Sequence, residues 1–583
     1  MVTKEELIKQ LFEKGILLNK ELLDNSSEAT LTDMLTKAKS EDDLLVLNDD
    51  NLSFVGEQKT LVDWHEIDRY RVEAEKERND QLYQTELQTP RQVNLNTPDI
   101  SSMPGSFSNT SSAFKSHLFS SLETELVDQG ASIFIEPNNE AILSPNKNIK
   151  EDSEDLTTTL LFPSNHKLEV VYSFLIEPQK FNPGHFTTLF ASRYNFIEKI
   201  LRQRSELQGT IAIGRLLKKK EKEKVSIIGL VENISLTKNG NLIISLEDLT
   251  GKISVIITKN RADIFAMAKD LVFDEVVGLT GTFQDKIIFA EEFFWPDVPE
   301  TNEMKKSDTE EYAIFLSDIH VGSSLFLKDE FNKFLQWING KVGNEQQKEI
   351  SSKVKYVIIS GDLVDGVGIY PGQEKELEIT DIKGQYAAFT DLIKKIPGDK
   401  FIVICPGNHD VTHIAEPQTT FYKEFAPSLY ELPNVILVSN PAMINVGKTK
   451  EFSGIDILMY HGFSFDYYVA NVESIRNGGG YHRADLIMKF LLKRRHLAPS
   501  FKSTPYVPGY KEDPLVIRKI PDIMVSGHIH YCSVSNYKGV TLICGSCWQA
   551  KTSFQEKLGH DPEPARVPLV NLKTRQVKIL NFN

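Results

Sequence analysis

The 583-residue sequence has only four cysteines and no long apolar run. So few cysteines exclude a disulfide framework and suit a reducing interior. No apolar stretch approaches the roughly 20 residues that a membrane-spanning helix needs. The basic, apolar and small-residue order of a secretory signal is also missing from the start of the sequence. We therefore expect a cytoplasmic protein without a membrane segment.

Positive charge is also scarce, because 66 Lys and Arg face 81 Asp and Glu, for a net charge of −15. An acidic average disfavours a nucleic-acid ligand, since phosphate binding needs local positive charge. The average nevertheless leaves basic stretches at residues 218–220 and 493–496. The second follows three glycines (478–480) and an amphipathic run (486–492). A basic helix beside a glycine hinge could steer a polyanion, although the same pattern fits a solvated helix face.

The chain is too long for one hydrophobic core, so we expect several domains. Residues 1–75 predict a helical protein-interaction module, in which Thr3 and Glu6 form a capping-box pattern. Residues 76–165 lose helical periodicity and are rich in Ser, Thr, Asn, Pro and acidic residues. Such a segment buries too little apolar surface to offset its ordering entropy, which predicts a disordered linker.

The apolar pattern of residues 166–305 predicts a compact β domain that begins with a helix at 186–201. Five short strands with a helical interruption at 262–268 resemble an OB-fold. OB-folds often bind single strands through aromatic residues and basic grooves. Here the aromatic residues Phe293, Phe294 and Trp295 come late, so we favour a subunit-docking role over direct DNA binding. The expected strands are 225–231, 242–246, 253–257, 276–280 and 287–289.

Five apolar runs in residues 306–583 each end at metal-binding residue types. Short runs rich in β-branched and aromatic residues predict buried strands, and a following Gly or Pro marks the carboxyl end. In open α/β sheets that edge binds ligands. Asp, Asn and neutral His suit Mn²⁺, Fe²⁺ or Zn²⁺ better than Ca²⁺, so the sequence predicts a two-metal hydrolase site. The runs are 313–316, 356–359, 401–405, 455–459 and 523–525, followed by Asp318 and His320, Asp362, Asn408 and His409, His461, and His528 and His530.

The order D-x-H, G-D, G-N-H-D, H-G, G-H-x-H resembles the calcineurin-like metallophosphoesterase family. The resemblance implies an α+β domain with a β-sandwich flanked by helices, and two divalent metals. Manganese is the expected metal, with Mg²⁺, Fe²⁺ or Zn²⁺ as alternatives. The resemblance further implies that His409 binds no metal and protonates the leaving alkoxide. By the same resemblance, Asp362 bridges the metals, Asp318, His320 and His530 complete one, and Asn408, His461 and His528 complete the other.

Residues 491–499 and 454–462, together with the OB-like domain, resemble more specifically the small subunits of archaeal family D DNA polymerases, within the polymerase B-subunit family. The resemblance covers about residues 166–583. It implies a 3′–5′ proofreading exonuclease in the archaeal cytoplasm, at the nucleoid. The implied partners are a large catalytic subunit in a heterodimer, primer–template or single-stranded DNA, and a sliding clamp reached through the complex. In the related eukaryotic subunits the site is degenerate, whereas here every ligand position is filled.

Two alternatives remain for residues 306–583. A protein or small-molecule phosphatase would share the metal site but would not need an OB-like domain. A non-catalytic polymerase scaffold would need the domains but not the ordered ligands. Other polar residues near the motifs could orient substrate or support the ligands, but we expect loop or packing roles for them. These residues are Asp365, Tyr370, Asp410, His413 and His482.

Overall fold

The computed structural model describes residues 16–18, 45–47, 168–175, 179–557 and 561–583. The chain divides into two units, residues 1–107 and 108–583. In the first unit, β1 (Ile16–Leu18) pairs in parallel with β2 (Leu45–Leu47). The helical module and linker predicted for residues 1–165 otherwise lie outside the described residues.

Two mixed, six-stranded sheets form the larger part of the second unit. All five apolar runs that precede the metal-binding motifs are strands, as the sequence predicted. The first sheet has the order β12 (Val435–Leu437), β11 (Phe401–Cys405), β10 (Val354–Ser360), β9 (Tyr312–Leu316), β18 (Arg566–Asn571), β19 (Val577–Asn581). The second has the order β16 (Ser533–Tyr537), β17 (Val540–Cys544), β15 (Ile523–Ser526), β14 (Ile455–Met459), β13 (Ala442–Val446), β3 (Leu168–Ser173).

The two sheets pack face to face. Phe315 of β9 lies in a buried cluster with Ile457 and Val525 of the second sheet, whereas its neighbour Ile314 packs on the opposite face. This alternation follows from the two-residue period of a strand. Each sheet therefore has an inner face toward the other sheet and an outer face toward helices, which confirms the predicted sandwich flanked by helices.

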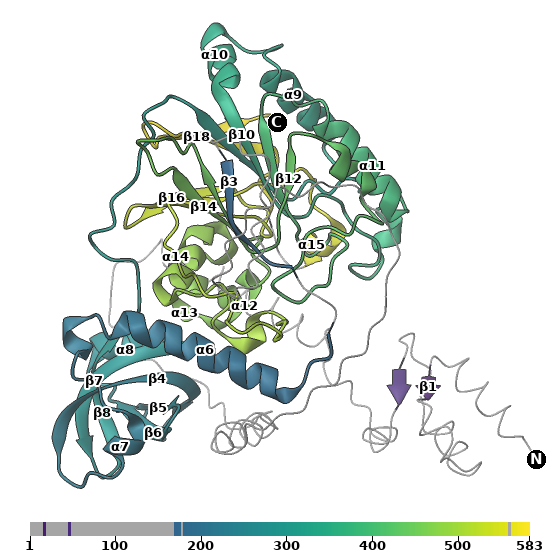
Figure 1. Cartoon of the computed structure of the whole chain (residues 1–583). Coiled ribbons are helices and arrows are strands. Elements are labelled where there is room, and N and C mark those ends of the chain that lie inside the picture. The colour runs from purple at the N-terminus through teal and green to yellow at the C-terminus, as the bar shows by residue number, and fades with distance from the viewer. Residues whose placement is uncertain (1–15, 19–44, 48–167, 176–178, 558–560) are drawn as a thin grey trace, which may run out of the picture. The chain divides into compact units, whose positions relative to one another are not determined.

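Helices cover both outer faces (Figure 1). Phe331, Phe334, Leu335 and Ile338 follow the helical period in α9 and are buried against the first sheet. The first sheet packs against α9 (Lys328–Ile338) and α11 (Ile382–Ile393), and the second against α12 (Phe465–Asn471) and α14 (Ala484–Arg494). The remaining helices of this part are α10 (Glu345–Lys353), α13 (Glu473–Asn477) and α15 (Ser553–Lys557). None of the helices in the described ranges is long and apolar enough to cross a bilayer.

A closed five-stranded barrel precedes the sandwich in the chain. Helix α8 (Ala262–Lys269) connects its third strand to its fourth, as predicted. Before the barrel, α6 (Pro183–Leu201) starts at Asn182, whose side chain accepts a hydrogen bond from the backbone of His185. A short helix, α7 (Ile213–Leu216), follows α6. The barrel order is β4 (Glu223–Leu236), β5 (Leu242–Asp248), β6 (Gly251–Ile257), β8 (Ile287–Phe294), β7 (Val276–Gln284).

Strand β3 belongs to the sandwich and not, as the sequence predicted for all of residues 166–305, to the β domain. It pairs antiparallel with β13, where Val170 lies opposite Ile444. Figure 1 shows this blue strand among the green and yellow strands of the sandwich. Val170 is buried in the core between the sheets. A short apolar run carries no information about which sheet it joins, so sequence periodicity could not assign it.

The basic stretch 493–496 is buried where the barrel meets the sandwich domain. Arg494 forms an ion pair of 2.7 Å with Glu275 of the barrel, and the Trp295 indole donates to the same carboxylate at 2.9 Å. The Lys493 ammonium lies 3.9 Å from the centroid of the Trp295 ring. Both interpretations offered by the sequence, a polyanion-steering helix and a solvated face, are therefore wrong. Arg494 and Lys493 contact the neighbouring barrel, whereas Arg495 donates to the Ile517 and Arg518 carbonyls of its own domain.

A second buried contact joins α6 to the same stretch. The guanidinium of Arg193 lies 2.7 Å from the carboxylate of Asp513, and both side chains are fully buried. Asp513 also accepts from the His496 imidazole, at 2.9 Å, while the other ring nitrogen of His496 accepts from the Ala498 backbone. These two bonds fix His496 as a neutral ring. Burial, reinforced by the Arg193 charge, lowers its pKa from 6.5 to about 4.

His496 should make the protein less stable as the solution is acidified. A histidine with a depressed pKa contributes stability that is complete above its unfolded pKa of 6.5 and is lost as the pH falls toward about 4. The wild-type protein should lose unfolding free energy between about pH 7 and about pH 5. In His496→Gln we expect this loss to be smaller by roughly 2 kcal/mol, because Gln donates to Asp513 without titrating. Urea unfolding of both proteins at the two pH values measures this. An unchanged pH dependence would contradict the assignment.

Candidate metal centre

The predicted ligands come from the loops that follow five strands. Asp318 and His320 follow β9, Asp362 follows β10, and Asn408 and His409 follow β11, all in the first sheet. The second sheet supplies His461 after β14, and His528 and His530 after β15. The structure brings all eight side chains together at one edge of the sandwich, where each lies close to at least one other of the set.

Several of these residues have a left-handed backbone. Asp318, His320 and Asp362 have φ values of 51°, 52° and 51°, and His528 and His530 have 73° and 55°. This conformation costs a residue with a side chain of the order of 1 kcal/mol or more. Hydrogen bonds between the loops hold it, including the His320 amide on the Asp362 carbonyl and the His528 amide on the Asp318 carboxylate. Strained, tightly held backbone of this kind clusters at functional sites.

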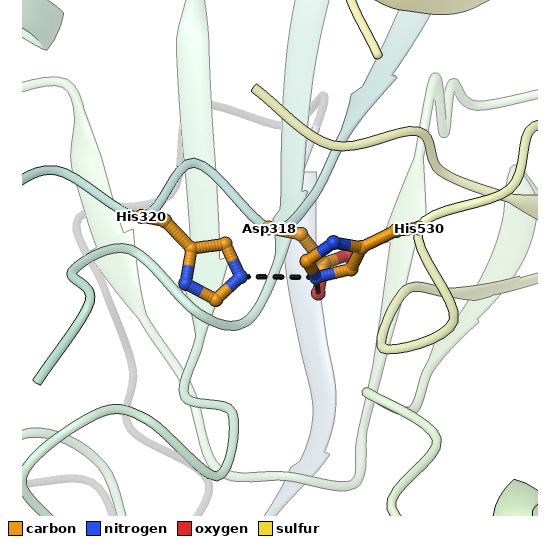
Figure 2. Close-up of side chains that lie close together, drawn as sticks. All are labelled: Asp318, His320 and His530. Atoms are coloured by element: carbon orange, nitrogen blue, oxygen red, sulfur yellow. Dashed lines mark hydrogen bonds and ion pairs between the residues drawn. The ribbon is translucent and has the colours of Figure 1, made fainter. Parts of the chain in front are cut away.

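Asp318, His320 and His530 form the first group (Figure 2). The Nε2 atoms of the two histidines face one another at 3.0 Å, and His530 Nε2 lies 3.3 Å from Asp318 Oδ1. One ligand atom of each residue lies within 4.8 Å of the others. Two imidazole nitrogens this close need a proton or a cation between them. The group could therefore hold a metal ion.

Asp362, His461 and His528 form a second group of the same size. Nε2 of His461 lies 3.3 Å from Asp362 Oδ2 and 3.0 Å from Asn408 Oδ1. The other ring nitrogen, Nδ1, donates to the carbonyl of Ser360 at 2.8 Å, so Nε2 keeps a lone pair for a ligand. Asp362 Oδ2 also lies 3.9 Å from His320, which places this carboxylate between the two groups.

Charge is concentrated in this buried site. Burial by itself opposes ionisation of Asp362, but the charges of His461 and His409 hold its pKa well below the usual value. Conversely, the Asp362 carboxylate outweighs the burial of His461 and raises its pKa to about 10. The raised pKa of His461 keeps a proton, and with it a positive charge, beside Asp362 in the metal-free protein. Divalent cations satisfy the same demand, so the donor set fits metal ions.

His409 lies beside both groups in a different setting. Its Nδ1 donates to the Asp365 carbonyl at 2.7 Å, and its backbone amide donates to Asp362 Oδ1 at 2.8 Å. Nε2 points into the site, 4.0 Å from Asp362 Oδ2. Burial, which outweighs the Asp362 charge, lowers the pKa of His409. His409 also forms a third group with His320 and Asp362, so geometry alone leaves it within reach of a metal.

Asp365 supports the site more directly than the sequence suggested. Its carboxylate is buried and lies 3.3 Å from Nδ1 of His320, which turns Nε2 of that ring toward His530. Gln373 and Gln549 both donate to Asp365 and hold it in place. The loop role expected for Asp365 was therefore incomplete, because a carboxylate behind a histidine fixes its tautomer and orientation.

The other polar residues near the motifs differ in their contacts. The Asp410 carboxylate accepts from the Gly407 and Leu363 amides, which confirms its expected loop role. His413 donates to the Ala415 carbonyl within its own loop. Tyr370 packs on Phe554, and His482 packs edge-on against Tyr531.

Two residues that touch the site were missed. Asp466 of α12 places Oδ2 3.0 Å from His528 Nε2, and the Gln555 amide of α15 lies 2.8 Å from His530 Nδ1. Asp466 follows the His461 motif closely enough that a helix start there would have indicated it. Gln555 lies in an ordinary polar stretch, and no pattern in the sequence marks it.

Comparisons with known proteins identify the family of this chain. The family of B subunits of DNA polymerases alpha and epsilon matches residues 313–533. The "DNA polymerase II small subunit" of Methanothermobacter thermautotrophicus is 41% identical over 400 residues, which cover 69% of this chain and 80% of the relative. The chain belongs to the archaeal DNA polymerase II small subunits, the family D small subunits.

Coverage of other members of this family is less complete. The small subunit of Pyrococcus furiosus is 42% identical over 401 residues, which span 68% of this chain and 64% of the relative. Among solved structures, one described as a "Novel Archaeal Phosphodiesterase" aligns with 46% of this chain and 98% of its own, at 13% identity. The TM-score of this alignment is 0.23.

Proposed function

We propose that this polymerase small subunit is a 3′–5′ exonuclease that hydrolyses phosphodiester bonds at DNA 3′ ends with two divalent metal ions. The observation that supports it most is the position of Asp362, whose carboxylate lies between the groups around His530 and His461. A carboxylate has two oxygens and can serve two cations at once. A domain of this calcineurin-like class with a filled ligand set is suited to phosphoester hydrolysis.

The two groups of facing side chains support this division of the ligands. Asp318, His320 and His530 would hold one ion, Asn408, His461 and His528 would hold the other, and Asp362 would contribute to both. Bound divalent ions, Mn²⁺ in our proposal, supply Lewis acidity toward the phosphate and lower the pKa of the attacking water. Asp365 and the Ser360 carbonyl hold the His320 and His461 rings so that Nε2 of each faces the other residues of its ligand group, where it would bind an ion.

His409 delivers a proton to the leaving 3′ oxygen. Its Nδ1–H is committed to the Asp365 carbonyl, so the proton that moves is carried on Nε2. Burial lowers the pKa of this ring, which opposes that protonation in the free protein. The approach of an anionic phosphate favours the protonated ring, so His409 takes up its proton with the substrate.

The barrel docks a large catalytic polymerase subunit in this proposal. Its strand order and the helix between its third and fourth strands support assigning it as an OB-fold. The late aromatic residues Phe293, Phe294 and Trp295 are buried, so they are not open stacking surfaces for DNA bases. Primer–template DNA would then reach the metal centre through the complex, together with a sliding clamp bound to that complex.

A non-catalytic scaffold is the second candidate function, because membership of the family requires assembly and not hydrolysis. The filled ligand set and the buried carboxylate behind His320 argue against it. A protein phosphatase fits the metal centre equally well but leaves the family relationship without a role. Both alternatives predict that the protein leaves a DNA 3′ end intact.

Asp362→Asn should abolish nuclease activity while the fold persists. The substitution keeps the shape of the side chain but removes the charge that two cations share, so the rate should fall by at least two orders of magnitude. The substrate is a primed DNA with a 3′ mismatch, digested with Mn²⁺ in the presence and absence of the large subunit. Near-normal activity of this variant would refute the shared-carboxylate assignment. A wild-type protein that leaves the DNA intact but dephosphorylates a phosphoprotein would refute the proposed exonuclease activity.

His409→Ala provides the matched comparison in the same assay. It should lose roughly two to four orders of magnitude in rate, the range of a general acid, while it retains both metals. Loss of a bound metal in this variant would show that His409 is a ligand, which the short distance to Asp362 permits.

Asp466→Ala should weaken metal binding without touching a ligand. Asp466 accepts from Nε2 of His528, which leaves the lone pair of that ring on Nδ1 and fixes its orientation. Loss of such a partner typically costs about 10- to 100-fold in metal affinity. Calorimetric titration of the metal-free protein with Mn²⁺ measures the loss. Glu473→Gln, which removes an exposed charge on α13, is the control and should bind as the wild type does.

A further inference from the structure

An exposed apolar edge lies directly beside the first group of ligands. Phe554 and Ile369 are each 40% exposed, and Val367 is 50% exposed. Tyr370 stacks on Phe554 with ring centroids 5.2 Å apart and planes 19° apart. We call Val367, Ile369, Tyr370 and Phe554 the apolar rim.

Both halves of the rim are tied to the metal centre. Phe554 directly precedes Gln555, whose amide contacts His530. The other half follows Asp365, which contacts His320 and whose carbonyl accepts from His409. The next residue, Gly366, is packed so closely that a Cβ there would lie 2.7 Å from the His409 carbonyl and 2.8 Å from Ile369. Both halves of the rim therefore adjoin residues that contact the candidate ligands.

A single carboxylate joins the two halves. Glu376 accepts from the Tyr370 hydroxyl at 2.9 Å and from the Ser553 backbone amide at 3.3 Å. These bonds hold the two aromatic rings as a stacked pair. They also place a negative charge behind the pair, which repels a phosphate group. The rim is thus suited to the uncharged base of a nucleotide and not to its backbone.

We infer that the apolar rim binds the unpaired bases at the 3′ end of a DNA strand whose terminal phosphodiester lies at the metal centre. This rests on the proposed function and names the part of the substrate that it selects. The face of Phe554 that Tyr370 leaves open stacks on a base, and every base has such a face, so binding tolerates any sequence. A paired end keeps its bases within the duplex, so the rim favours frayed or mismatched ends.

The test compares two labelled single strands, one with normal nucleotides at its 3′ end and one with abasic sites in the last three positions. Binding is measured by fluorescence anisotropy of full-length protein with Ca²⁺ in place of Mn²⁺, which separates binding from cleavage. Phe554→Ala should weaken binding of the normal strand roughly tenfold, the loss of one stacked base, and leave the abasic strand within about twofold. Phe554→Trp should restore it.

Phe181→Ala is the matched control, because Phe181 has similar exposure, at 45%, and packs on His185. It should bind both strands as the wild type does. Equal weakening of the two strands by Phe554→Ala, or no weakening of either, would overturn the inference. The inference would also be overturned if Phe554→Ala bound both strands normally but failed to assemble with the large subunit, because the rim would then belong to a protein interface. Hydrolysis with Mn²⁺ is a separate readout, so a wild type that binds selectively but cannot cleave refutes the exonuclease alone.

Discussion

The burial of carboxylates at one edge of the sandwich is the constraint on which this site depends. Asp318, Asp362 and Asp365 are almost completely buried, and moving each charge out of water costs several kcal/mol in a real protein. Histidines from both sheets provide the opposing charge, and the left-handed loops bring them within reach. A structure that only needed stability would replace such a cluster with apolar residues. Such a cluster points to chemistry, because its charges are suited to hold cations.

The sequence predicted the strands, and the eight side chains that meet at their ends, because each of those residues closely follows an apolar run. A five-part pattern leaves little freedom, so local signals sufficed. It could not place β3, because pairing with β13 is a long-range choice. The sequence also gave no sign that residues 493–496 form a domain contact, because the ion pair of Arg494 with Glu275 depends on how the barrel packs. Asp365 was undervalued and Asp466 was missed for a related reason: each contacts a histidine that follows a different strand.

The barrel and the sandwich domain meet through buried charges. Arg193 with Asp513 and Arg494 with Glu275 both join segments far apart in the sequence. Removing one partner of such a pair costs about 3–5 kcal/mol, because the other charge stays buried and unpaired. The basic stretch therefore serves the contact between two parts of the second unit. Its charges are therefore not displayed on an open surface for a polyanion.

The most direct measurement is the number and position of metal ions in a crystal of the metal-free protein soaked with Mn²⁺, located by anomalous scattering. We expect two Mn²⁺ ions, one bonded to Asp318 and His530 and the other to His461. Each should also lie about 2 Å from an oxygen of Asp362. A single ion, or two ions of which neither is bonded to Asp362, would contradict the central claim that this carboxylate serves two cations.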